Sequence, residues 1–247
     1  MKTAVAAGLA LVAAGMTAHA AEPQGWKFEL TPMAWLAGME GDGSIKGRDF
    51  EFEKSFGDLV ESVDMAAGLL GTAQYDRYLF WAQLDFISSD TDNLDSGDQP
   101  AHLSASSDLF LGEAAVGYQV DGWSEGQTFD LLVGLRTAKI DTKLDVNGGP
   151  SLEDDTTLVD PMLVVRPRIP VLPSMIDGLS FNSTMAIGGG GDSKLVYELQ
   201  PQFQYDATDS LSFRLGYRRV GYKFDGEGDN ELNISLAGLI LGAGFKF

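Results

Sequence analysis

The 247-residue sequence contains no cysteine, which excludes a disulfide framework, a thiol nucleophile and thiolate metal sites. Histidine is nearly as scarce: His19 lies in the first twenty residues, and His102 lies in a serine-rich stretch. A Ser–His–acid triad needs partners held on rigid elements, and no G-x-S-x-G motif occurs. We therefore expect no catalytic residues, no metal ligands and no cofactor, and the sequence does not point to an enzyme.

Basic residues are also few, with 17 Lys and Arg against 36 Asp and Glu, a formal net charge of −19. Such an acidic chain is a poor candidate for binding nucleic acid, because phosphates need Lys and Arg. After residue 20, no stretch approaches ~20 consecutive apolar residues, so no membrane-spanning helix is predicted.

The first twenty residues have the three parts of a secretory signal peptide. These are the charge of Lys2, a small-apolar run from Ala4 to Gly15, and the A-x-A site Ala18-His19-Ala20. We predict that residues 1–20 are a signal peptide and that residues 21–247 form one domain. A buried N-terminal helix is the alternative for the apolar run. Loss of Lys2 leaves the mature chain at −20.

The stretch Leu232–Phe247 alternates between two faces. Alternate residues of a strand point to opposite sides, and one side here is apolar and aromatic to its last residue. We expect lipid to cover that side, and a sheet that spans a membrane must close into a barrel. The apolar side consists of Phe247, Phe245, Ala243, Leu241 and Leu239.

Ten segments alternate in this way, which predicts an all-β, transmembrane, antiparallel up-and-down barrel of ten strands. Pro161, Pro167 and Pro170 fall within one segment and cannot donate ladder hydrogen bonds, so eight strands remain an alternative. The segments are Trp26–Leu36, Met65–Tyr75, Leu79–Ile87, Leu109–Val120, Phe129–Leu144, Leu158–Ile169, Leu179–Ile187, Leu195–Tyr205, Leu211–Phe224 and Leu232–Phe247.

Two irregularities are expected within this pattern. The alternation breaks at Arg218-Arg219, and a bulge there would turn Val220, Tyr222 and Phe224 to the outer side. The stretch Phe56–Val63 is a candidate for a helical turn inside the first long connection.

Short and long connections alternate along the chain, as in barrels with periplasmic turns and outer loops. Aromatic residues fall near the ends that this pattern assigns to the periplasm, which favours an interfacial girdle over an ordinary aromatic core. They are Trp26, Phe28, Tyr75, Phe80, Tyr118, Trp123, Phe129, Phe181, Phe203, Tyr205, Phe213, Phe245 and Phe247.

Charged residues of both signs occur on the inward side of the predicted strands. Barrels of eight to ten strands fill their interiors, so these side chains indicate an ion-paired plug, with a narrow selective pore as the alternative. The predicted lumen network consists of Glu29, Asp85, Glu113, Arg136, Asp160, Arg166, Arg168, Glu198, Arg214 and Arg218.

Acidic residues concentrate in the long connections 38–62, 90–108, 145–156 and 224–231, which hold twenty of them and only three basic residues. A solvated surface explains this, and shared divalent cations beside lipopolysaccharide are a second interpretation. The stretch Asp90–Asp98 resembles a calcium loop but places Leu94 where a ligand belongs.

The stretches GWKFELTPMAWLAGMEG, DSLSFRLGYRRVGYKF and LAGLILGAGFKF resemble small Gram-negative outer-membrane barrel proteins of the OmpA/OmpW-like, porin-like group. The resemblance implies export to the outer membrane, contact with its lipid and lipopolysaccharide, and assembly by the barrel-assembly machinery. Phe247, Phe245, Ala243, Leu241 and Leu239 would form the assembly signal. The expected function is a structural or narrow-pore role. The alternatives are adhesion or ligand binding through acidic outer loops and, less favoured, a lipid-modifying enzyme.

Overall fold

A computed structural model describes residues 25–45, 48–54, 63–94, 103–146, 152–225 and 231–247. The predicted signal peptide, the stretch 56–62 and His102 lie outside these residues. No helix among the described residues is long and apolar enough to cross a membrane. The strands are β1 (Trp26–Ile45), β2 (Arg48–Lys54), β3 (Val63–Tyr75), β4 (Tyr78–Leu94), β5 (Leu103–Asp121), β6 (Thr128–Val146), β7 (Leu152–Pro170), β8 (Leu179–Gly188), β9 (Leu195–Asp206), β10 (Leu211–Asp225) and β11 (Glu231–Lys246).

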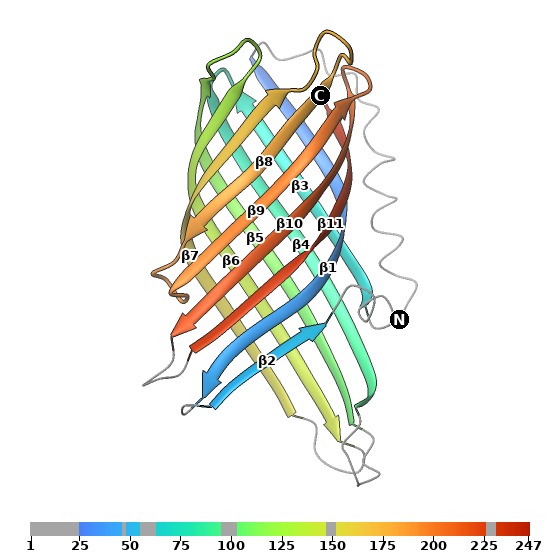
Figure 1. Cartoon of the computed structure of the whole chain (residues 1–247), viewed down its shortest axis with the longest axis vertical. Helices are drawn as coiled ribbons and strands as arrows, with labels where there is room; N and C mark the ends of the chain where they lie inside the picture. Colours follow the sequence, from blue (N-terminus) through green and yellow to red (C-terminus); the bar gives the residue numbers. More distant parts are fainter. Residues whose placement is uncertain (1–24, 46–47, 55–62, 95–102, 147–151, 226–230) are drawn as a thin grey trace.

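The strands form a closed antiparallel barrel (Figure 1). Each strand from β3 to β10 pairs with its successor, β1 pairs with β3, and β11 pairs with β1 to close the sheet. Phe28 and Phe247 exchange both backbone hydrogen bonds at this seam. β2 is a hairpin extension paired to β1, so the wall has ten strands, and the predicted single-domain up-and-down barrel is confirmed.

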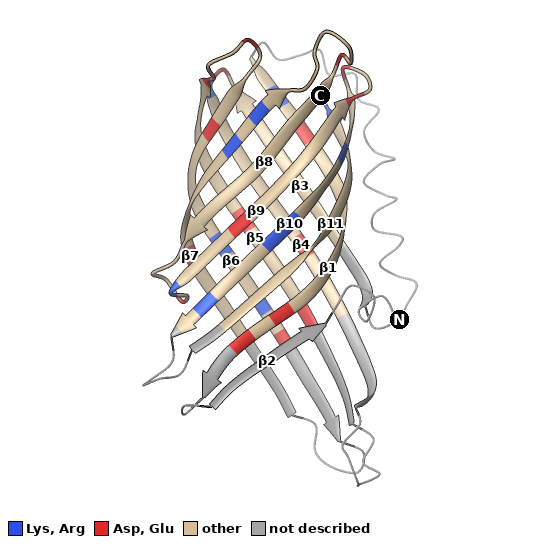
Figure 2. Cartoon of the chain, in the orientation of Figure 1, with Lys and Arg blue, Asp and Glu red and all other residues tan. Residues whose placement is uncertain are grey.

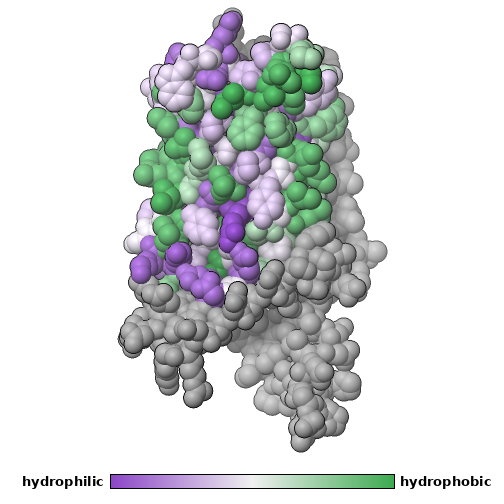
Figure 3. All heavy atoms as spheres, in the orientation of Figure 1, coloured by the Kyte–Doolittle hydropathy of each residue, from purple (hydrophilic) through white to green (hydrophobic). Residues whose placement is uncertain are grey.

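The alternation of each strand separates an apolar outer face from an inner face rich in polar groups. On β9, Leu199 and Phe203 are half exposed, whereas Gln200 and Gln202 are buried. A polar or charged side chain is costly in hydrocarbon, so these residues face the lumen and not the lipid. On the visible outer wall, hydrophobic residues occupy both flanks at middle height, with paler and more hydrophilic residues between them (Figure 3).

The two ends of the barrel differ. Four connections, at 76–77, 122–127, 171–178 and 207–210, lie at the end that also carries Phe247, here called the short-turn end (Figure 1). Aromatic side chains cluster there on the outer face: Trp26 contacts Tyr75, and Trp123 contacts Phe129 with ring centroids 5.2 Å apart in both pairs. These rings form one border of the apolar belt, where amphipathic rings are favoured.

Polar side chains on the outer face mark the opposite border of the belt. Ser88 donates a hydrogen bond to Asp108, and Lys139 pairs with Asp141. From Tyr78 to Ser88 the strand advances ten residues, which matches the ~9–11 residues of a membrane-crossing strand. β4 to β7 continue past this border as an extension of the barrel (Figure 1).

Three sequence expectations need correction. The stretch 48–54, assigned to a loop, is strand β2. Most strands also extend further at the far end than expected. Both were missed because polar residues in these segments give no alternation of hydropathy. The bulge at Arg218-Arg219 is wrong: β10 pairs without a register shift, Arg219 stays outside, and Val220 and Tyr222 stay buried inside. The expectation failed because it assumed a uniformly polar lumen.

The prolines are accommodated within the wall, which excludes the eight-strand alternative. Along β7 and β8, the paired positions Val165–Met185 and Arg168–Asn182 flank a gap at Pro167. Pro32 and Pro201 lie in equivalent gaps of the β1–β11 and β9–β10 ladders. A residue without an N–H thus coincides with an interruption of the ladder, while the strand keeps its register.

Candidate functional site: the ion-paired core of the lumen

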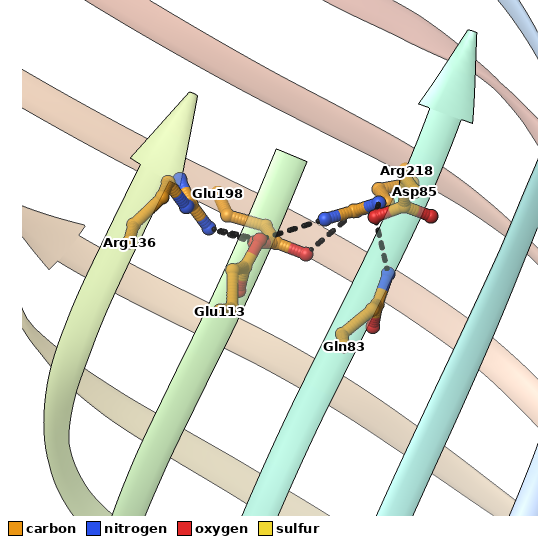
Figure 4. Close-up of polar contacts among 6 residues, drawn as sticks. All are labelled: Gln83, Asp85, Glu113, Arg136, Glu198 and Arg218. Carbon is orange, nitrogen blue, oxygen red and sulfur yellow. Dashed lines mark hydrogen bonds and ion pairs between the residues drawn. The ribbon is translucent and has the colours of Figure 1, made fainter. Parts of the chain in front are cut away.

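The lumen is filled in layers. Nearer the short-turn end lies an apolar layer that includes Met33, Leu79 and Trp81. Nearer the far end lies a second apolar layer that includes Trp35 and Tyr222. Charged residues of both signs lie at the height between them (Figure 2). We call the group of Gln83, Asp85, Glu113, Arg136, Glu198 and Arg218 the central cluster (Figure 4).

Arg218 is the hub of the central cluster. Its Nε donates to Glu198 Oε1 at 2.8 Å, its Nη2 donates to Glu113 Oε1 at 2.8 Å, and its Nη1 donates to Asp85 Oδ2 (Figure 4). The guanidinium lies over the ring of Trp35, 4.6 Å from the centroid. Three carboxylates and a π face therefore surround a side chain that is 0% exposed.

Arg136 binds two of the same carboxylates from β6. Its Nη2 lies 2.9 Å from Glu113 Oε1 and also contacts Glu198 Oε2. Glu198 thus uses one oxygen for each arginine (Figure 4). Gln83 completes the cluster by donating to Asp85 Oδ2 at 3.3 Å.

The central cluster holds three carboxylates and two guanidiniums, all between 0% and 3% exposed. Removing charges from water is costly, and the cost is recovered only where geometry and hydrogen bonding are good. The network therefore depends on every member, and loss of one partner leaves an uncompensated buried charge. Such an arrangement favours one fixed packing of the lumen.

A second group of predicted lumen residues lies nearer the short-turn end. Arg214 Nη2 donates to Glu29 Oε1 at 2.7 Å, and Ser212 donates to the same oxygen. Arg166 lies 3.7 Å from Asp130 and 5.7 Å from the centroid of the Trp81 ring.

The two remaining predicted residues lie apart from these groups. Arg168 is half exposed at the rim and pairs with Asp206 at 2.9 Å, an aspartate that Lys246 also binds. Asp160 is buried and accepts the backbone N–H of Ser193 at 2.9 Å, so it anchors the 189–194 connection. The structure thus divides the ten predicted residues into a central cluster, a second layer and two separate contacts.

Sequence reasoning missed several members of these groups. Gln83, Trp35 and Asp130 share the inward alternation of their strands, so the signal was present but was applied only to selected charges. Asp206 and Lys246 were missed because they lie at strand ends, where the alternation carries little information.

The residues of the predicted assembly signal lie on the outer wall. Leu239, Leu241, Phe245 and Phe247 are each 38–53% exposed, and Ala243 is partly buried. Their position is that of a lipid-facing row, and their role in assembly remains a prediction.

No group of three or more His, Asp or Glu residues is arranged to hold a metal ion in the part of the chain that the structure describes. Residues 95–98 of the calcium-like stretch lie outside that part.

Comparison with known proteins identifies no related sequence: no family model and no curated protein matches. Solved structures match at low identity. The outer membrane protease OmpT from Escherichia coli is 9% identical, with a TM-score of 0.46, and the match covers 94% of this chain and 99% of that one. Ail, the attachment invasion locus protein of Yersinia pestis, is 10% identical with a TM-score of 0.41, covering 90% and 99%. Neisserial surface protein A is 11% identical with a TM-score of 0.32, covering 89% and 97%. These neighbours are small outer-membrane barrels, and at these values the likeness carries no argument about activity.

Proposed function

We propose that this protein is an integral outer-membrane barrel with a sealed, non-conducting lumen and a structural role in the membrane. The burial of the central cluster carries the proposal. A bore wide enough for water would leave side chains on its wall exposed, yet Arg218, Gln83 and Arg136 are 0–1% exposed at mid-height. Two apolar layers above and below complete the seal.

The strand number supports the same proposal. A barrel of about ten strands has an interior that side chains can nearly fill, unlike the 16–18 strands of channels with an aqueous bore. Large side chains such as Trp35 and Trp81 occupy the layers beside the charges. The narrow-pore alternative would require these layers to part.

Single-channel recording in planar bilayers tests the proposal. We expect the wild-type protein to give no defined steps, and the variant Trp35→Ala with Arg218→Ala to conduct, because it trims adjoining layers of the seal. Defined steps from the heat-modifiable wild-type protein would overturn the proposal. A silent variant alongside a silent wild type would place the block elsewhere in the lumen and overturn the role of the central cluster.

Binding at the far end is a second candidate, favoured by the extension of β4 to β7 beyond the outer polar border. Twenty of the 36 acidic residues fall in the long connections of the sequence, so a cationic ligand, including divalent cations beside lipopolysaccharide, is the expected partner class. Binding of poly-lysine to the reconstituted protein should weaken when Asp92, Asp95 and Asp98 are replaced by Asn. Unchanged binding would remove this candidate.

The proposal includes the barrel-assembly machinery as the partner of β11 during insertion, and it includes no catalytic step. The exposed row that ends at Phe247 supports this role, because its side chains are available before the seam with β1 closes. Phe247→Ala should lower the folded fraction in membranes without changing the stability of the folded barrel. Equal insertion of both proteins would contradict it.

A further inference from the structure

The outer wall carries an apolar groove of about 760 Å³ on the β1–β6 side of the barrel. Its floor is a row of small side chains on three neighbouring strands: Gly71 pairs with Ala82, and Ala82 pairs with Ala114. Leu30 and Leu135 continue the row on the flanking strands β1 and β6. Because the row crosses four strand spacings of ~4.8 Å, the groove is ~19 Å long.

Larger side chains form the wall of this groove toward the short-turn end. The row of Phe80, Val116 and Val133 is 47–57% exposed and stands above the floor. The same row has a gap at Ala73, between Phe28 and Phe80. The wall is therefore lowest at Ala73, from which β3 continues toward the turn at Asp76 and Arg77.

A cation stands at this turn. Arg77 lies in the β3–β4 turn with its side chain 42% exposed, and its guanidinium pairs with Asp121 at 2.7 Å. Tyr75 lies on β3 between Ala73 and this turn and packs against Trp26, and Tyr78 follows the turn on β4; both tyrosines are exposed. A guanidinium on a turn flanked by exposed tyrosines is suited to a phosphate diester at the membrane surface.

We propose that this groove binds one glycerophospholipid, with an acyl chain along Ala114, Ala82 and Gly71 and the phosphate beside Arg77. The inference goes beyond the sealed lumen and rests only on the wall being embedded in lipid. The groove lies within the belt that hydrocarbon already contacts, so the ligand needs no separate route to it. Its volume falls within the ~300–1,000 Å³ of small-molecule sites, and its length suits an extended acyl chain.

Native mass spectrometry of the whole barrel in detergent, titrated with phosphatidylglycerol, tests the proposal. We expect one lipid retained per wild-type barrel, and about tenfold weaker retention by Ala82→Leu with Ala114→Leu. Both positions face outward and are exposed, so larger apolar side chains fill the groove without entering the lumen. Ala34→Leu is the matched control, an exposed outward position on β1 that does not line the groove.

Arg77→Gln separates the phosphate contact from the acyl contact. We expect it to weaken phosphatidylglycerol retention while leaving retention of an uncharged diacylglycerol unchanged. Equal lipid retention by the wild type and the groove-filled variant would overturn the proposal. A wild-type dimer that the same variant dissociates would also overturn it, because the occupant would then be a second copy. Ala82→Leu alone repeats the test if the double variant gives little heat-modifiable barrel. Lipid retention is measured independently of conductance, so failure of the sealed-lumen proposal and failure of this one are distinguishable.

Discussion

Arg218 and Arg219 are neighbours in β10, yet their surroundings differ completely. Arg218 points into the lumen, where three carboxylates and the ring of Trp35 enclose it. Arg219 points outward, is 44% exposed, and contacts Glu40 on β1 and Ser235 on β11. A shift of one residue along the strand therefore moves the charge from the lumen, where it must be paired, to the outer face, where solvent and headgroups can stabilise it. Position relative to the wall, rather than residue type, decides how much each arginine contributes.

The largest effect is expected from Arg218→Met. The substitution leaves three carboxylates buried around an apolar side chain, and breaking a buried ion pair in this way costs about 3–5 kcal/mol. Urea unfolding of the barrel in detergent, followed by the heat-modifiable band shift, measures the cost. If Arg218→Met lost less unfolding free energy than Arg219→Met, the matched variant on the outer face, the role of Arg218 as the hub would be contradicted.

Glu198→Gln should have the next largest effect. Glu198 is the carboxylate that gives one oxygen to each arginine, so an amide loses one acceptor and places a donor against a guanidinium. Removing such a charged acceptor costs about 1.5–3 kcal/mol. The same unfolding experiment applies, and wild-type stability would show that Glu198 is replaceable.

Glu113→Gln should cost less than Glu198→Gln. Both arginines bind the same oxygen of Glu113, and the central cluster has one carboxylate more than it has guanidiniums. Loss of this charge makes the cluster neutral, which offsets part of the lost hydrogen bonding. A double-mutant cycle of the two glutamates measures their coupling, and a larger loss for Glu113→Gln would reverse the proposed ranking.

The smallest effect is expected from Arg219→Met, the matched control for Arg218→Met. Exposed ion pairs contribute at most about 1 kcal/mol, and salt screens them. We expect unfolding midpoints within that range of the wild type, with a difference that shrinks further at high salt. A loss equal to that of Arg218→Met would mean that the outer pair is shielded from solvent.

Alternation along the chain was enough to predict the barrel and most of its strands. The pattern is local: apolar Leu199 and Phe203 alternate with polar Gln200 and Gln202. It is sufficient to predict the barrel because a membrane-spanning sheet must be apolar outside and closed. The pattern failed for β2 and the far-end extensions, whose sequences are rich in polar residues. It also failed at Val220, since an apolar side chain inside the lumen is indistinguishable in sequence from one facing lipid.

The candidate site was predictable only in part. Inward alternation pointed to Arg218 but passed over Asp130, and it could not separate the central cluster from the contacts of Arg168 and Asp160. Which inward charges meet depends on strand tilt and on the register around the barrel. Neither is encoded within a single segment.

The sequence alone predicted a closed wall with ten strands as the favoured number, because each strand carries its two faces in its own residue order. Only the tertiary structure decided that Arg218 meets Asp85 and Glu113, which are 133 and 105 residues away along the chain. Closing the sheet brings β10 opposite β4 and β5 across a narrow lumen, and the stagger of the strands sets which side chains share a height. The contacts inside the barrel are thus a property of its closure.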